Sequence, residues 1–187
     1  MIDLHVHLDG SIRQSTLEAL FEGDLPDVKF YTNMGIQEAL ASFRTTLSVM
    51  QELDRITRIT HELCVDLIEL GTNRAEIRFA PQLHCNGDIE SVIDAAIAGL
   101  KPKFNLILCG LYGEPPEVLD DLVKAARKRP RVVGIDLAGS PLEEHKWNLI
   151  DYSRPFTEAM RVGLGRTVHA GEGRPSEEIK VAIEHLH

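Results

Sequence analysis

The chain has 187 residues, of which 43% are hydrophobic and 26% charged, as in an ordinary globular domain with a hydrophobic core. Its formal net charge is −9 and its lysines and arginines are scattered, which argues against a nucleic-acid partner. No apolar run approaches the roughly 20 residues of a membrane-spanning helix, and residues 1–11 lack the pattern of a signal peptide. We expect neither nucleic acid nor membrane as a partner.

The three cysteines do not form a recognisable motif. Cys64, Cys85 and Cys109 are far apart, have no CxxC spacing and are odd in number, which argues against a disulfide framework. We therefore expect a protein of the reducing cytoplasm.

Short β-rich segments alternate with helical patterns along almost the whole chain. The β-rich segments contain Val, Ile, Leu or Phe between Gly or Pro residues, and they predict strands over 2–6, 74–80, 104–111, 131–139 and 166–171. Apolar residues three and four apart predict helices over 15–22, 35–50, 52–71, 88–101, 115–129 and 154–163.

Local signals support several of these boundaries. Asp88, with Ser91 three residues later, is a typical helix start, and so is the proline pair 115–116. Glycine follows or closes three of the predicted helices, at Gly71, Gly99 and Gly163.

Strands that alternate with helices indicate an α/β fold with parallel strands and right-handed crossovers. Two architectures are candidates: an open doubly wound sheet and a (β/α)8 TIM barrel. The segment HVHLDGS (5–11) after the first strand has no glycine-rich dinucleotide or phosphate motif, which favours the barrel. A complete barrel takes about 250 residues, so we expect about the first five βα units here, in one domain over 1–187 that forms the N-terminal portion of the barrel.

The connection between the first two strands is unusually long. In a barrel, its helices over roughly 33–71 would lie over the C-terminal mouth as a helical lid insertion. A plain structural insertion is about equally compatible with the pattern.

The first strand carries the pair His5 and His7. Residues two apart on a strand project to the same face, so both imidazoles can chelate one metal ion. The alternative is a chance pair in which one histidine only packs in the core. His169 ends the fifth strand, and because strand ends converge at a barrel mouth, the three histidines become candidate ligands of one zinc with an open position for water.

Glu172 follows His169 by three residues, between Gly171 and Gly173. A carboxyl group there can transfer a proton to a substrate if burial raises its pKa. The alternative is a solvated loop glutamate, but the position beside a strand-end histidine favours the catalytic interpretation.

Three further residues interrupt apolar strands. Asp136 needs a partner if it is buried, and we expect a structural hydrogen bond rather than catalysis. Gly139 can expose a backbone group to a ligand because no side chain blocks it. Arg78 is expected to pair with an internal carboxylate.

The remaining histidines have simpler interpretations. His61, His84 and His145 are expected on the surface or in packing. His185 and His187 repeat the HxH spacing, but on a helix residues two apart face different directions and chelate poorly.

Four segments in this order, HVHLDGS (5–11), AEIRFAP (75–81), VVGIDLAG (132–139) and TVHAGE (167–172), resemble the adenosine deaminase family of the amidohydrolase superfamily. The resemblance spans residues 1–187, and the four motifs are jointly specific. It implies a TIM barrel of the metal-dependent hydrolase type with one Zn²⁺ at its C-terminal mouth. It also implies a cytoplasmic hydrolase of purine metabolism, which acts on the C–N bond of adenosine to give inosine and ammonia.

The motifs also imply roles for individual residues. His5 and His7 correspond to the first two zinc ligands of the family, and His169 corresponds to the third. The metal-bound hydroxide of such an enzyme attacks carbon 6 of the purine, because zinc lowers the pKa of its water from about 15.7 to about 7.

The substrate contacts follow from the same motifs. Asp9 corresponds to a ribose contact, with His7 also near the substrate, and the backbone of Gly139 faces the purine. Glu172 corresponds to the residue that protonates the purine ring nitrogen.

The chain departs from the family pattern in two ways. The family's GHG histidine and its paired aspartates, one of them a zinc ligand, are not found in residues 1–187. Ser140 and Pro141 stand where many members have acidic residues. We expect that the natural protein is longer, or that self-association or a complementing C-terminal segment supplies the rest.

The sequence therefore predicts zinc-dependent deamination of a small-molecule purine nucleoside. Adenine and aminofutalosine are alternative substrates, although Asp9 favours a nucleoside because members that act on the free base tend to have Glu there. An inactive truncated barrel that needs a missing C-terminal segment is the alternative from another class.

Overall fold

The computed structural model describes residues 1–31, 33–139, 146–172 and 174–187. Each predicted strand and helix is confirmed to within a few residues, and the helical pattern over 175–187 also forms a helix. His145, Ser140 and Pro141 lie outside the described residues. The elements in chain order are β1 (Ile2–His7), α1 (Gln14–Leu20), α2 (Ile36–Val49), α3 (Leu53–Glu69), β2 (Arg74–Phe79), η1 (Pro81–Leu83), η2 (Cys85–Gly87), α4 (Ile89–Gly99), β3 (Phe104–Leu111), α5 (Pro116–Ala126), β4 (Val132–Ala138), η3 (Leu149–Tyr152), α6 (Ser153–Arg161), β5 (Gly165–Val168) and α7 (Glu177–Leu186).

One strand is shorter than expected. The sequence predicts a strand over 166–171, but β5 ends at Val168. The backbone N–H of His169 still bonds to the carbonyl of Leu137, after which Gly171 turns the chain with φ of +76°. His169 therefore lies directly after the strand.

The chain divides into two compact units, Met1–Asn105 and Leu106–His187. The expectation of one domain over 1–187 stays a prediction. No described helix combines the length and the apolar character that crossing a bilayer requires.

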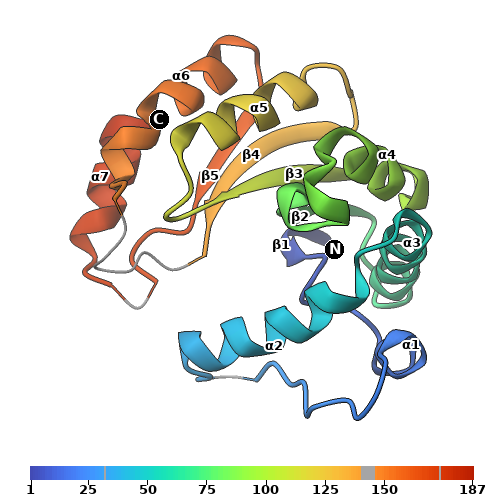
Figure 1. Cartoon of the computed structure of the whole chain (residues 1–187). Coiled ribbons are helices and arrows are strands. Elements are labelled where there is room, and N and C mark those ends of the chain that lie inside the picture. The colour runs from blue at the N-terminus through green and yellow to red at the C-terminus, as the bar shows by residue number, and fades with distance from the viewer. Residues whose placement is uncertain (32, 140–145, 173) are drawn as a thin grey trace. The chain divides into compact units, whose positions relative to one another are not determined.

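The first unit combines the parallel pair β1 and β2 with the helices α1 to α4. In the register of this pair, Ile2 lies beside Arg74 and His7 beside Arg78. The helices α3 and α4 pack against each other (Figure 1). Their buried faces repeat every three to four residues, as the periodicity predicts, with Ile56, Ile59, Leu63 and Leu67 on α3 and Val92, Ile93 and Ala96 on α4.

Two boundary signals of α4 are confirmed, one for a different reason than expected. The Asp88 side chain caps the helix by accepting a hydrogen bond from the Ser91 N–H at 3.2 Å. Gly99 ends α4, but a Cβ there would lie 2.4 Å from the carbonyl oxygen of Thr57 and 2.7 Å from Cβ of Thr60. Glycine is needed at this position because α3 comes very close.

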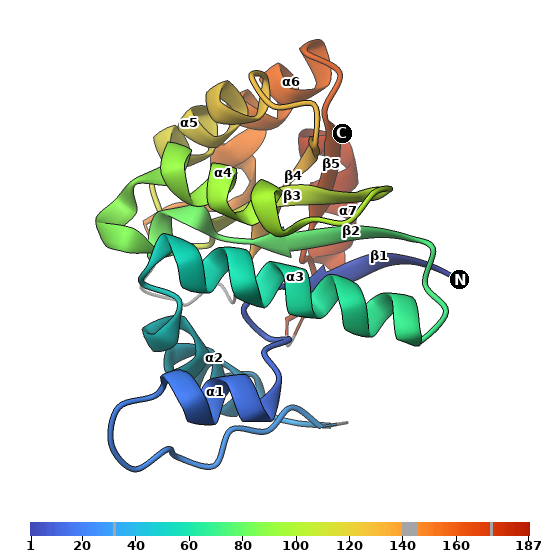
Figure 2. The same cartoon turned by 90° about the vertical axis from the view of Figure 1, so that its right-hand side faces the viewer.

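The segment 33–71 contains α2 and α3, which pack against different helices. Figure 2 shows α2 beside α1, with which it is in contact, while α3 packs on α4. A salt bridge of 2.6 Å joins Arg13, before α1, to Asp66 of α3. The packing of α3 is that of a helix in an outer layer, and the lid role of 33–71 stays a prediction.

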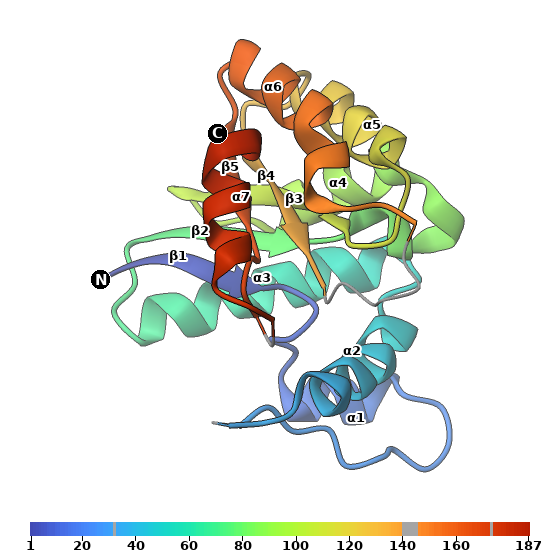
Figure 3. The ribbon, with the colours of Figure 1, turned by 90° about the vertical axis from the view of Figure 1, so that its left-hand side faces the viewer.

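The second unit places α5, α6 and α7 with the parallel strands β3, β4 and β5. The strands β3 and β4 are buried over almost their whole length, as expected for parallel strands that are covered on both faces. Figure 3 shows α7 beside α6, and the two helices are in contact. The carboxyl ends of these strands carry Tyr112, Gly139 and His169.

Candidate active site

The end of β1 presents two imidazoles on one side of the strand. The rings of His5 and His7 are 5.3 Å apart between centroids, with His5 exposed and His7 half-buried. The rings of His7 and Phe43, which is in α2, pack edge to face with 6.0 Å between their centroids. The spacing along the strand thus brings the two nitrogen donors together as predicted.

Asp9 lies two residues beyond this pair and is 7% exposed. Burial raises the pKa of its carboxyl to about 7, although the backbone N–H groups of Asp9 and Gly10 oppose this shift. Its Oδ1 has no hydrogen-bond donor among the described residues. Because an unsatisfied buried oxygen is costly, a ligand hydroxyl that donates to Oδ1 would stabilise this arrangement.

The end of β5 presents His169, whose side chain is 10% exposed. Its Nδ1 lies 3.1 Å from Oδ2 and 3.3 Å from Oδ1 of Asp136, a fully buried residue of β4. The expectation that Asp136 has a structural hydrogen bond is confirmed. That its partner is a candidate metal ligand was not expected from the sequence.

Tyr112 is a second contact of His169 that sequence reasoning missed. Its hydroxyl donates to the backbone carbonyl of His169 at 2.9 Å. Burial raises the pKa of the Tyr112 hydroxyl above its usual value, so it remains a donor at neutral pH. The signal that could have found it is its position directly after β3, since strand ends carry the site in this fold.

The remaining predicted site residues are less constrained. Glu172 is exposed among the described residues, so its surroundings in this structure do not distinguish a catalytic carboxyl group from a solvated loop glutamate. Gly139 follows β4 with φ of +79°, a conformation that other residues rarely adopt. Among the described residues, a Cβ there would contact Leu111 alone, at 3.7 Å, so the backbone conformation is the feature that favours glycine here.

Arg78 and His84 are buried in the first unit. The Nη2 of Arg78 donates to the backbone carbonyl of Leu4 in β1 at 2.8 Å, and its pairing with an internal carboxylate stays a prediction. The Nδ1 of His84 lies 3.0 Å from the carbonyl oxygen of Met50. His84 thus has the packing role expected of it.

The described residues fit a zinc ion. Imidazole is a common zinc ligand, and β1 supplies two within one short segment. Histidines that bind zinc usually have a carboxylate or a carbonyl beside their other ring nitrogen, and Nδ1 of His169 lies 3.1 Å from the Asp136 carboxylate. The end of β1 thus offers two imidazole ligands, and the end of β5 offers one that has such a carboxylate beside it.

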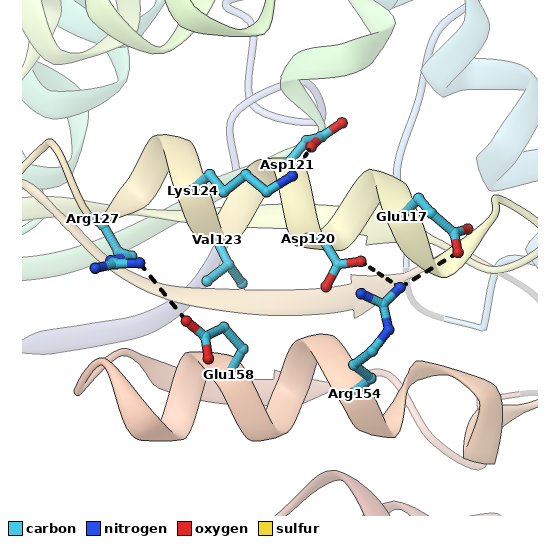
Figure 4. A pocket seen from close by; sticks show the side chains of 8 residues that line it. All are labelled: Glu117, Asp120, Asp121, Val123, Lys124, Arg127, Arg154 and Glu158. Atoms are coloured by element: carbon cyan, nitrogen blue, oxygen red, sulfur yellow. Dashed lines mark hydrogen bonds and ion pairs between the residues drawn. The ribbon is translucent and has the colours of Figure 1, made fainter.

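A hollow of about 650 Å³ between α5 and α6 has a different character. Arg154 of α6 forms ion pairs with Asp120 at 2.6 Å and with Glu117 at 3.4 Å, and Arg127 pairs with Glu158 at 3.8 Å (Figure 4). Because these charged side chains pair with one another, they link α5 to α6 and leave few free charges for a ligand in the hollow.

The adenosine deaminase family model matches residues 1–187. The chain belongs to the adenosine deaminase family. It is 35% identical over 207 residues to adenosine deaminase of Clostridium kluyveri, covering 95% of this chain and 58% of the relative. It is 34% identical over 213 residues to the Clostridium acetobutylicum enzyme, covering 100% and 62%.

Solved structures of the same fold cover almost the whole chain. Arabidopsis ADAL in complex with IMP matches with a TM-score of 0.82 and 25% identity, over 98% of this chain and 62% of that one. The N6-methyl-AMP deaminase of Arabidopsis thaliana matches with a TM-score of 0.81 and 26% identity, over 98% of this chain and 61% of that one. An amidohydrolase from Burkholderia ambifaria with bound zinc matches with a TM-score of 0.80, over 100% of this chain and 56% of that one. Because its sequence identity is 20%, this match shows the fold alone. These matches confirm the TIM-barrel fold class for the five βα units.

The chain spans about three fifths of the length of the curated relatives that it matches, 58% and 62% in the two clostridial enzymes.

Proposed function

We propose that the protein hydrolyses the exocyclic amine of adenosine and releases inosine and ammonia, as part of a zinc-dependent barrel. The observation that carries the choice of a nucleoside is Asp9, a buried carboxyl group two residues from the histidine pair, whose Oδ1 has no hydrogen-bond donor among the described residues. A ligand hydroxyl or amine can supply such a donor, and a ribose carries hydroxyl groups.

His5, His7 and His169 are the proposed zinc ligands. Two come from the end of β1 and one from the end of β5, and strand ends of this kind surround the C-terminal mouth of a TIM barrel. Zinc, when bound there, supplies a nucleophilic water at neutral pH. The chain's own contribution is to hold the ligands and to orient the substrate toward them.

Two residues are proposed to act on the purine. The backbone of Gly139, which has φ of +79° and no side chain of its own, faces the base. Glu172 transfers a proton to the ring nitrogen, which stabilises the negative charge that develops as carbon 6 is attacked. The exposure of Glu172 implies that substrate or a further part of the barrel covers it during the reaction.

A purine nucleoside monophosphate is the second candidate substrate. Arabidopsis ADAL and the Arabidopsis N6-methyl-AMP deaminase match this chain at 25% and 26% identity, and ADAL structures contain IMP or GMP. The curated relatives named adenosine deaminase are more similar, at 34% and 35% identity, so adenosine remains the first choice.

The test is a set of steady-state rates of ammonia release on adenosine, AMP, N6-methyl-AMP, adenine and aminofutalosine, with the metal content of the same sample. We expect adenosine to have the highest kcat/KM and the protein to contain zinc. A clear preference for either monophosphate selects the second candidate, and a preference for adenine contradicts the role of Asp9.

Assembly and location are proposals as well. We propose a cytoplasmic protein whose barrel is completed by further polypeptide, either a complementing C-terminal segment or a second copy. Intact mass of the natural product and its elution in size-exclusion chromatography distinguish these cases. A product of 20.9 kDa that remains monomeric and releases no ammonia from any of the five substrates favours the inactive truncated barrel instead.

A further inference from the structure

We propose that Asp136 and Tyr112 are positioning residues that hold His169 in one orientation and one tautomer, with Nε2 as the nitrogen that offers its lone pair to the metal. This inference rests on the proposed function, in which His169 binds zinc. It concerns two residues to which neither the family resemblance nor the sequence pattern assigns such a role.

The backbone of His169 is held from both sides. Its N–H donates to the carbonyl of Leu137 in β4 at 2.9 Å, and its carbonyl accepts from the Tyr112 hydroxyl at the same distance. Tyr112 is itself fixed, because its ring packs perpendicular to that of Tyr152 at 6.4 Å between centroids. Tyr152 in turn donates to the carbonyl of Glu114 at 2.8 Å. The peptide that carries the ligand is thus tied to the loop after β3 and to β4.

The side chain of His169 is held by Asp136. This carboxylate has no solvent exposure, and Cys109 of β3 directs its Sγ to Oδ2 at 3.6 Å. Nδ1 of His169 faces this carboxylate, and because a carboxylate accepts hydrogen bonds, the contact places the imidazole proton on Nδ1 and leaves the lone pair on Nε2. The same contact sets the rotation of the ring, so the lone pair of Nε2 has a defined direction.

The position of Asp136 within the sheet explains why this contact is rigid. Asp136 lies in the middle of β4 and is paired in register with Thr167 of β5, two residues before His169. Both partners are therefore attached to neighbouring strands, whose pairing fixes the distance between their backbones. A loop residue would provide the same hydrogen bond with far less restriction on its direction.

The tautomer can be measured on the metal-free protein, independently of catalysis. We expect the ¹⁵N chemical shifts of the His169 ring to show protonated Nδ1 and unprotonated Nε2 at neutral pH. In Asp136→Asn the negative charge is lost, and we expect a mixture of tautomers. A wild-type ring with its proton on Nε2, or a wild-type mixture, would overturn the proposal.

Zinc affinity provides a second measurement, by titration of zinc chloride against a chromophoric chelator. We expect the dissociation constant to rise about 10- to 100-fold in Asp136→Asn and about 2- to 10-fold in Tyr112→Phe, which removes one hydrogen bond. Asp120→Asn is the matched control, since it makes the same change in a carboxylate of α5 that pairs with Arg154. Unchanged affinity in both positioning variants would refute the proposal.

His169→Ala separates the failure of this inference from failure of the proposed function. If His169→Ala binds zinc as the wild type does, His169 is not a ligand and the proposed metal site is wrong. If His169→Ala loses zinc while Asp136→Asn and Tyr112→Phe retain wild-type affinity, only the positioning role is wrong. Should Asp136→Asn fail to fold, Tyr112→Phe and the wild-type tautomer still decide the question.

Discussion

The ends of β1 and β5 present histidines in two different ways. His5 and His7 follow each other on one strand, where an exposed and a half-buried ring share a side because of local backbone geometry. His169 is a single ligand candidate, and its orientation depends on Asp136 and Tyr112 from two other strands or their ends. Two ligands on one strand are brought together by the two-residue period of that strand alone. A single ligand is oriented by contacts with residues that are distant in the sequence.

Removal of the lone ligand has the largest expected effect. His169→Ala should lose stoichiometric zinc and lower kcat/KM for adenosine by about a thousandfold or more, because the metal contributes several kcal/mol to the transition state. Metal analysis and ammonia release measure both effects. His61→Ala, on an exposed position of α3, is the matched control and should match the wild type.

The second prediction contrasts His169 with His84, a buried histidine that has a carbonyl partner in place of a carboxylate. Burial lowers the pKa of His84 to about 4, below its unfolded value of 6.5. Its contribution to stability is thus fully present above pH 6.5 and is lost as the pH falls toward 4, by about 3 kcal/mol in total.

Urea unfolding at several pH values, compared between the wild type and His84→Gln, isolates this contribution. The difference in the pH dependence of the unfolding free energy should be confined to the range between pH 6.5 and 4. Identical pH dependence in the two proteins would contradict the assignment.

The third prediction concerns Asp9, beside the histidine pair. Asp9→Ala should lower kcat/KM for adenosine about 10- to 100-fold, since a hydrogen bond to a charged or partly charged group contributes about 1.5–3 kcal/mol. The effect should be much smaller on adenine, which has no ribose. Equal losses on both substrates would show that Asp9 acts on folding or on the metal instead of the sugar.

The smallest expected effect concerns Cys109, which contacts Asp136 and so acts on His169 indirectly. Cys109→Ala removes the weak S–H donor to Asp136 and should raise the zinc dissociation constant about two- to threefold. Cys109→Ser retains a donor and should bind zinc as the wild type does. A loss of affinity in Cys109→Ser as large as in Cys109→Ala would point to packing rather than to the hydrogen bond.

Much of the fold could be read from local patterns. The capping of α4 by Asp88 and the start of α5 at Pro116 depend on residues within one turn of the helix, and both were predictable. The reason for Gly99 was not, because the atoms that exclude a side chain there belong to α3, about 40 residues earlier. Likewise, the length of β5 was overestimated because the sequence places the strand end at the glycine of RTVHAG, whereas the pairing with β4 ends at Val168.

Some properties of the candidate site could likewise be predicted from the sequence, and others could not. By itself, the sequence determined that His5 and His7 share a side, since this follows from a two-residue period, and its motifs determined the family. Only the tertiary structure decided that Asp136 bonds to His169, that Tyr112 holds the His169 backbone, that Asp9 is buried with an unsatisfied oxygen and that Glu172 is exposed. These properties depend on which strands and loops lie next to each residue, and hydrogen-bond partners and burial are set by neighbours in space rather than along the chain.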